Sequence, residues 1–110
     1  MYHFPASVSG YFILDDLTTV LLASGPTKQF KLLPEKREYP IDVHLPKRLW
    51  NKLPQDISNE AYVIHVAGDL LPLYPRSIIK ADHFEVISLI VPSEILEKHE
   101  QEEYLRFIAP

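Results

Sequence analysis

Ten prolines divide the 110-residue chain into short segments, and only three glycines accompany them. The prolines lie at positions 5, 26, 34, 40, 46, 54, 72, 75, 92 and 110. Proline fixes φ and lacks the backbone N–H, so it is disfavoured inside helices and central strands. This spacing therefore predicts short strands joined by turns, with no long helix before Pro92.

Several segments between the prolines have strand character, because they are rich in β-branched and aromatic residues or alternate between apolar and polar side chains. The predicted strands span residues 7–14, 18–23, 39–45, 61–69 and 78–89. Residues 29–32 can continue the pairing of the second strand after the turn at 24–26. The last strand can bend near Ala81 and Asp82.

Two helices are predicted beside these strands. Residues 46–53 suit a short helix, because Pro46 fits its first turn and leucines recur every four residues from Leu45 to Leu53. After Pro92, Ser93 is suited to be the N-cap of a C-terminal helix, in which acidic residues predominate.

The order of these elements is three strands, a short helix and two strands, followed by the terminal helix. This order predicts a mainly β fold, a five-stranded OB-fold-like barrel with a short helix between strands 3 and 4 and a C-terminal helix. The chain length suits one domain. We assign residues 1–91 to the barrel and residues 92–110 to an acidic helix of the same domain.

Motifs in the second half of the chain carry a family resemblance. They are Ile41-Asp42-Val43-His44-Leu45, Lys47-Arg48-Leu49, the V-x-G-x-L pattern of Val66, Gly68 and Leu70, and Ala81-Asp82. Together they resemble bacterial single-stranded-DNA-binding proteins, mainly over residues 39–90. The resemblance implies an OB-fold and binding of single-stranded DNA in preference to RNA. Two departures from this family are visible. The family carries a Gly before its fourth strand, where this chain has residues 58–60. The family's Gly-rich linker and acidic tip have no counterpart in this sequence, so the resemblance does not imply recruitment of partner proteins by that tip.

Charge is distributed unevenly along the chain, whose net charge is -4. Residues 24–54 contain seven basic and three acidic side chains, whereas residues 82–110 contain two and seven. A protein that binds single strands requires cations that replace the counterions along the phosphates, and flat rings on which bases stack. The candidate nucleic-acid-binding residues are Lys28, Phe30, Lys31, Tyr39, Trp50, Tyr74 and Arg76. Tyr39 lies where the similar family carries a stacking aromatic residue, and Tyr74 and Arg76 fall in the loop between the last two strands.

Other interpretations of these residues remain open. The basic segment can be an ordinary solvated surface, the aromatic residues can belong to the core, and Trp50 can cap the barrel together with the short helix. The alternative function is that of a protein–protein interaction module or accessory subunit, or a homo-oligomer. Such a protein would use the barrel as a scaffold and would contact its partner through the acidic C-terminal helix. The apolar stripe of this helix is formed by Leu96, Tyr104, Phe107 and Ile108.

Enzymatic, metal and membrane functions find little support in the sequence. The chain has no Cys, its five histidines do not show the spacing of H-E-x-x-H, and no G-x-S-x-G or phosphate-binding loop is present. We therefore expect neither catalysis nor a cofactor or metal, although His44 and His65 could face each other across paired strands. No apolar run is long enough to span a membrane and the start does not resemble a secretory signal, which together predict a cytoplasmic protein.

Overall fold

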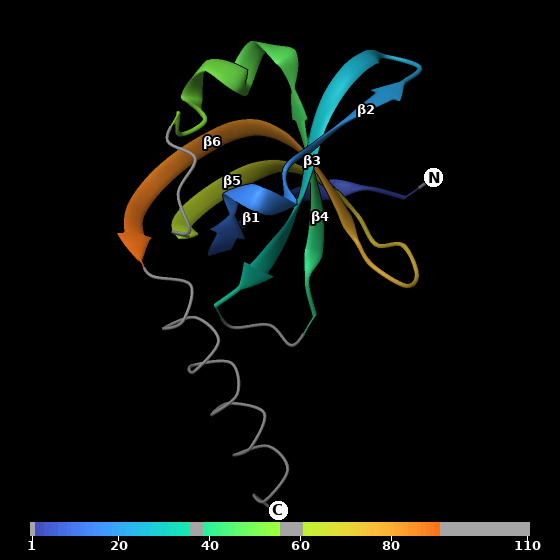
Figure 1. Ribbon diagram of the computed structural model, residues 1–110. Coiled ribbons are helices and arrows are strands. Elements are labelled where there is room, and N and C mark those ends of the chain that lie inside the picture. Colours follow the sequence, from blue (N-terminus) through green and yellow to red (C-terminus); the bar gives the residue numbers. More distant parts are fainter. Residues whose placement is uncertain (1, 36–38, 56–60, 91–110) are drawn as a thin grey trace, which may run out of the picture.

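The computed structural model of the chain describes residues 2–35, 39–55 and 61–90 (Figure 1). Six strands and two short 3-10 helices occur in this part of the chain. In order they are β1 (Phe4–Ile13), η1 (Leu14–Asp16), β2 (Thr18–Leu22), β3 (Gly25–Pro34), β4 (Ile41–Pro46), η2 (Lys47–Lys52), β5 (Ala61–Leu71) and β6 (Ile78–Ile90). The predicted helix over residues 92–110 lies outside the described residues.

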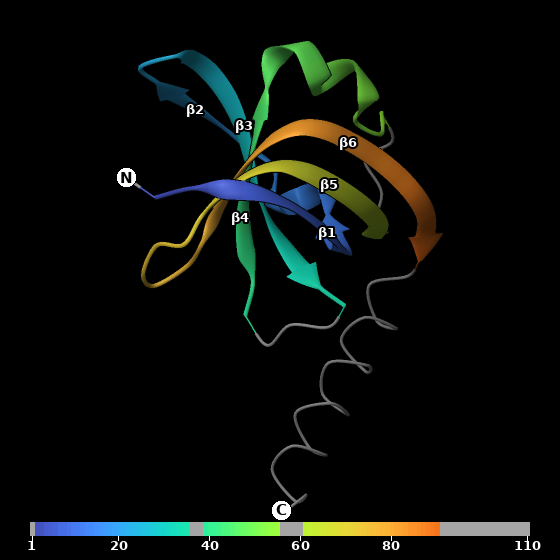
Figure 2. The same cartoon turned by 180° about the vertical axis from the view of Figure 1, so that it is seen from behind.

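Five of the strands close into a barrel in the order β1-β5-β6-β4-β3 and back to β1. Neighbouring strands are antiparallel except β4 and β6, which pair in parallel from Asp42 and Ile78 onward. The sixth strand, β2, forms a hairpin with β3 outside this ring (Figure 2). The prediction of a mainly β, five-stranded barrel with a short helix after its third ring strand is confirmed, and the strand order is consistent with an OB-fold-like architecture.

One strand assignment is wrong. Residues 18–23 were predicted as the second barrel strand and residues 29–32 as its continuation, but the ring strand is the ten-residue β3. Pro26 and Pro34 resemble strand breakers in the sequence. In the structure they lie at the second and last positions of β3, where their missing N–H groups do not interrupt the central part of the strand.

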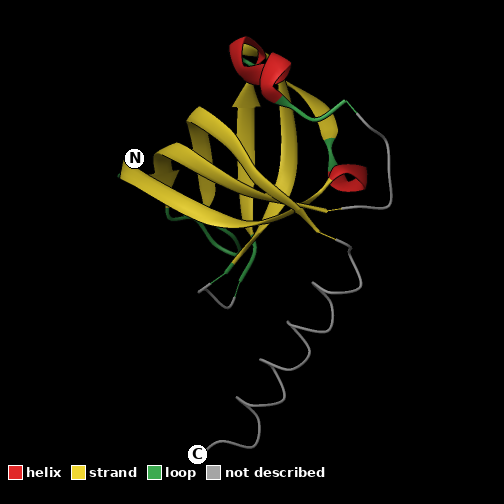
Figure 3. Cartoon of the chain, turned by 90° about the vertical axis from the view of Figure 1, so that its left-hand side faces the viewer, coloured by secondary structure: helices red, strands yellow, loops and turns green. Residues whose placement is uncertain are grey.

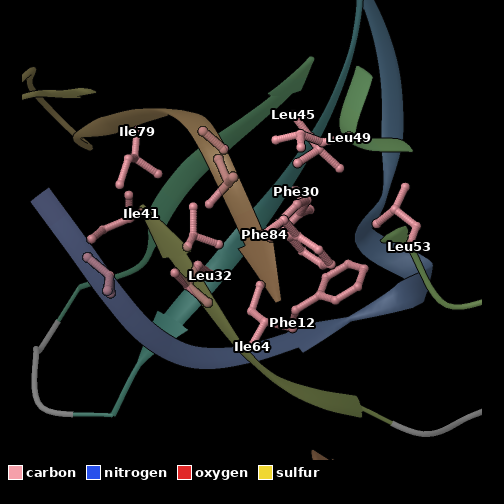
Figure 4. Packing of buried hydrophobic residues seen from close by; sticks show 14 of the residues in the cluster. Phe12, Phe30, Leu32, Ile41, Leu45, Leu49, Leu53, Ile64, Ile79 and Phe84 are labelled. Atoms are coloured by element: carbon pink, nitrogen blue, oxygen red, sulfur yellow. The ribbon is translucent and has the colours of Figure 1, made fainter. Parts of the chain in front are cut away.

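The barrel interior is filled by large apolar side chains from all five ring strands. Phe12, Phe30 and Phe84 lie at its centre (Figure 4), and the ring centroids of Phe12 and Phe30 are 4.4 Å apart. The 3-10 helix η2 covers one end of the barrel (Figure 3), where Leu49 is buried. The predicted short helix therefore exists as the 3-10 helix Lys47–Lys52, and Leu49 packs against the core.

Two glycines lie where neighbouring backbones approach closely. A Cβ at Gly10 would overlap the carbonyl group of Leu33, at the point where β1, still paired with β5, also pairs with β3 to close the barrel. A Cβ at Gly68 would overlap the carbonyl oxygen of Lys80 in β6. The register between β5 and β6 shifts beside Gly68, so that Asp82 has no directly opposite residue. This irregularity lies at residues 81–82, where the sequence predicts a bend, and it coincides with the close approach of the backbones at Gly68.

Candidate nucleic-acid interface

The outer surface of β3 and β4 is framed by two projections. The β2–β3 hairpin and the β5–β6 loop (residues 72–77) extend from the same side of the barrel in both Figures 1 and 2. Alternation along the strands places buried Ile41, Val43 and Leu45 inside the barrel. Between them lie the half-buried Asp42 and His44, which face outward. We call the outward side chains of Gln29, Lys31, Asp42, His44 and Lys80 the β3–β4 face.

Phe30 is not part of this surface. Its side chain is only 1% exposed and packs against Phe12 and Phe84 in the core. A base stacks on an aromatic side chain only where one face of the ring is accessible. The prediction that Phe30 contacts nucleic acid is therefore wrong, because the alternation of β3 turns this side chain inward while its neighbour Lys31 points outward.

Lys28 and Trp50 lie together at the end of the barrel that η2 covers, apart from the β3–β4 face. Lys28 is opposite the buried Leu45, and its Nζ atom lies 5.0 Å from the centroid of the Trp50 ring, in cation–π geometry. The indole N–H of Trp50 donates a hydrogen bond to the carbonyl oxygen of Leu45 at 2.9 Å. This arrangement matches the alternative interpretation, in which Trp50 caps the barrel with the short helix. The predicted basic segment is thus divided between two places.

Trp50→Phe tests this assignment. We expect the free energy of unfolding to fall by about 1 kcal/mol, because the substitution removes the hydrogen bond that the indole N–H donates to the carbonyl oxygen of Leu45. Urea titration followed by circular dichroism would measure the loss. The affinity of the folded variant for an oligonucleotide should equal that of the unchanged protein. A large loss of affinity without a loss of stability would instead place Trp50 in the interface.

Lys31 and Arg76 do lie on the outer side, and both are adjacent to the same carboxylate. Lys31 is directly opposite Asp42 in the β3–β4 register, and Arg76 Nε is 3.3 Å from Asp42 Oδ2. This contact is an ion pair, but its N–H is not aligned for a hydrogen bond, and Asp42 Oδ1 is buried without a hydrogen-bond partner. Part of the charge of Arg76 is therefore offset by Asp42, and Lys80 lies opposite a second carboxylate, Asp69, in the β5–β6 register.

Tyr39 and Tyr74 are the most accessible aromatic residues near this face, at 73% and 97% exposure. Tyr39 precedes β4 by two residues and Tyr74 lies in the β5–β6 loop. Because β4 and β6 run parallel and begin side by side, the segments that lead into them reach the same end of the barrel. The backbone N–H of Asp42 also donates to the carbonyl oxygen of Ser77 at 3.0 Å, which joins the two segments. These two predicted residues are brought to one border of the β3–β4 face.

His44 and Lys80 are residues of this face that the list of candidates did not include. His44 Nε2 lies 3.2 Å from Gln29 Oε1, and His44 is next to Lys80 in the parallel pairing of β4 and β6. Burial lowers the pKa of His44 below 6.5, with Lys80 adding to the shift and Asp42 opposing it. The imidazole is therefore neutral at pH 7, and its Nε2 lies within hydrogen-bond distance of the Gln29 side-chain amide. The alternation of apolar residues around Lys80 in the sequence was the signal that could have identified it.

The lowered pKa of His44 predicts a loss of stability in mild acid. Below pH 6.5 the unfolded chain binds a proton at this residue that the folded chain does not, so the free energy of unfolding falls as the pH drops through that window. Above pH 6.5 the full contribution is present. Urea midpoints measured at about pH 7.5 and pH 5.5 should differ less in His44→Gln than in the unchanged protein. Equal differences in the two proteins would contradict the assignment.

The opposite side of the barrel carries a serine–histidine pair. Ser9 Oγ lies 2.8 Å from Nδ1 of His65, across the antiparallel pairing of β1 and β5. A nucleophilic serine also needs its histidine to be oriented by a third group. The nearby carboxylate of Glu85 lies 3.7 Å from His83 instead. His44 lies on β4 and His65 on β5, and these two strands are not paired with each other because β6 lies between them. The prediction that the two histidines could face each other across paired strands is therefore wrong.

Comparison of the chain with protein-family models, with curated proteins and with solved structures returns no match. The architecture therefore rests on the observed strand order, and no relative supports the resemblance to bacterial single-stranded-DNA-binding proteins. Within residues 2–35, 39–55 and 61–90, no three His, Asp or Glu side chains gather into a possible metal site. In the same part of the chain, neither helix has the length and apolar character needed to cross a membrane.

Proposed function

We propose that the protein binds single-stranded nucleic acid, DNA in the first instance, across the β3–β4 face. The observation that carries the proposal is the pair of exposed tyrosines, Tyr39 and Tyr74, at one border of a face that bears Lys31 and Lys80. Stacked bases and neutralised phosphates are the two interactions on which single-strand binding relies. In OB-folds, oligonucleotides cross this surface between the loops that frame it.

The charges of the described residues on this surface suit binding of a polyanion with modest affinity. Lys31, Lys80 and Arg76 are set against two carboxylates, while His44 is neutral. Asp42 lies opposite Lys31 and pairs with Arg76, and Asp69 lies opposite Lys80 in the β5–β6 register. The two exposed rings can stack on bases of any sequence, because every base has a π-face. We therefore expect weak, salt-sensitive binding with little base preference from the tyrosines themselves.

Fluorescence anisotropy with labelled oligonucleotides at low salt tests the proposal. We expect micromolar protein to bind a single-stranded DNA oligonucleotide more tightly than the duplex of the same sequence, and an RNA strand of that sequence provides the comparison between nucleic acids. Absence of binding to every single strand at low salt would overturn the proposal.

Lys31→Gln should reduce the salt dependence of this binding. Each phosphate contact contributes about 0.7 to the slope of log affinity against log salt for a single strand, so removing one cation should flatten the slope by about that amount. Titrations between about 50 and 200 mM salt would measure it. Lys28→Gln is the matched control, because Lys28 is held over Trp50 away from the face. Equal flattening by both variants would contradict the placement of the strand on the β3–β4 face.

A second candidate function is protein–protein interaction, and one observation favours it. Val86, Ile87 and Leu89 are exposed near the end of β6, where the described pairing of this strand is with β5 only. An accessible strand edge with apolar side chains is a surface on which another chain can pair. Size-exclusion chromatography with light scattering, repeated on Ile87→Asp, would test it. A monomer at every concentration would count against self-association through β6.

A further inference from the structure

A groove opens on the outer surface at the end of the β3–β4 face next to the β2–β3 hairpin. Its volume is about 130 Å³, and its walls include Leu22 from the hairpin and His44 and Pro46 from β4. Thr27 and Ala81, both buried, form part of its lining, and the exposed Lys80 lies at its edge. The groove is therefore continuous with the β3–β4 face through His44 and Lys80.

The lining has the chemistry of a site for a flat, uncharged ring attached to an anion. Leu22 and Pro46 present apolar side chains from two different elements, and the imidazole of His44 is neutral at pH 7. Lys80 supplies the one ammonium group of the lining. A phosphate alone would leave the apolar walls without a partner, whereas a nucleobase would cover them and place its sugar-phosphate backbone near Lys80. Apolar walls with a few polar groups are typical of sites that bind small rings.

We propose that this groove receives one nucleobase of the bound strand, while the neighbouring phosphates lie along Lys80 and Lys31. The proposal rests on the proposed function and specifies it, because it makes the Leu22–His44–Pro46 groove the place where a base is inserted rather than stacked on the surface. Tyr39 and Tyr74 then hold further bases at the other border of the β3–β4 face.

Leu22→Ser and Leu21→Ser form a matched pair that tests the groove. Both substitutions leave the charge unchanged and both residues belong to β2, but successive residues of a strand point to opposite sides, and Leu21 is not part of the groove lining. Leu21 is 83% exposed and Leu22 is 37% exposed, so neither substitution removes a core side chain. Melting curves of the two variants would verify that both are folded.

We expect Leu22→Ser to weaken binding of a thymidine oligonucleotide about tenfold, which corresponds to the loss of one stacked base. Leu21→Ser should leave the affinity unchanged. The same measurements on an oligonucleotide of abasic sites, which keeps the phosphates and lacks the rings, should show no difference between the two variants. Equal affinities of both variants for the thymidine strand would overturn the groove proposal, and so would an equal loss with the abasic strand, which would assign the groove to phosphate.

Failure of the groove proposal can be distinguished from failure of the proposed function. If the unchanged protein binds single strands but Leu22→Ser behaves as Leu21→Ser does, the groove assignment fails and the β3–β4 face stands. If the unchanged protein binds no single strand, the proposed function fails and the groove proposal fails with it. As a second measurement, methyl NMR signals of Thr27 and Ala81 should shift when the thymidine strand is added, and unchanged signals in a saturated complex would contradict insertion of a base.

Discussion

Replacing Gly68 by Ala should lower the free energy of unfolding by about 3 kcal/mol, near the upper end of what overpacking of an interior causes. The added methyl group would overlap the carbonyl oxygen of Lys80, and it would lie 2.8 Å from the carbonyl carbon of that residue and 2.9 Å from Ala81 Cα. These atoms are backbone, so no side-chain rotation can relieve the collision. The strands β5 and β6 would have to separate at the position where their register shifts.

Ala67→Ser is the matched control for Gly68→Ala. Each substitution adds one heavy atom to neighbouring positions of β5, but Ala67 is only half-buried. We expect Ala67→Ser to change the free energy of unfolding by no more than about 0.5 kcal/mol. Urea denaturation of both variants gives the comparison. Similar stabilities of the two variants would mean that the approach of β5 to β6 at Gly68 leaves room for a Cβ, which would contradict the prediction.

Tyr39→Ala and Tyr74→Ala should each raise the dissociation constant for a single-stranded oligonucleotide about tenfold, because each removes one ring on which a base stacks. The two side chains belong to different segments, so we expect their effects to add and the double variant to lose about a hundredfold. Both residues are highly exposed, and stability should therefore be unaffected. Anisotropy titrations at one salt concentration would measure the three dissociation constants.

Ile87→Ala provides the control for these tyrosine variants. Ile87 is 55% exposed near the end of β6, away from the two projections that frame the β3–β4 face (Figure 1). Its loss should not change the affinity for the oligonucleotide. An effect of Ile87→Ala as large as that of Tyr39→Ala would show that exposed apolar surface in general, rather than the border of the β3–β4 face, determines binding.

Much of the fold could be predicted because strand character is local. Side-chain type and spacing predict the first and last strands of the barrel and the short helix after Pro46. They also indicate the position of the β6 irregularity at residues 81–82. The full length of β3 could not be predicted, since its terminal prolines resemble breakers and become tolerable only through their positions in the barrel. Gly68 was recognised as part of a motif, but the backbone contact that requires it joins two strands and is not visible in one segment.

The candidate site was less predictable, because it depends on which side of a curved strand each residue occupies. β3 does not alternate strictly: Thr27 is buried, Lys28 and Gln29 are half-buried, and Phe30 is buried again. Burial alternates regularly only from Gln29 onward, so the inward side of Phe30 and the outward side of Lys31 could be assigned only once the course of β3 was known. The convergence of Tyr39 with Tyr74 depends on the parallel pairing of β4 with β6, a contact between segments that lie far apart in the sequence.

The most direct test of the proposed single-strand binding is to map the bound strand on the protein by two-dimensional amide NMR. Addition of a single-stranded DNA oligonucleotide should shift the signals of Gln29, Lys31, His44 and Lys80 on the β3–β4 face. Ser9 and His65, which form a hydrogen bond on β1 and β5, should remain unchanged. Shifts confined to β1 and β5, or none at saturating oligonucleotide, would contradict the account.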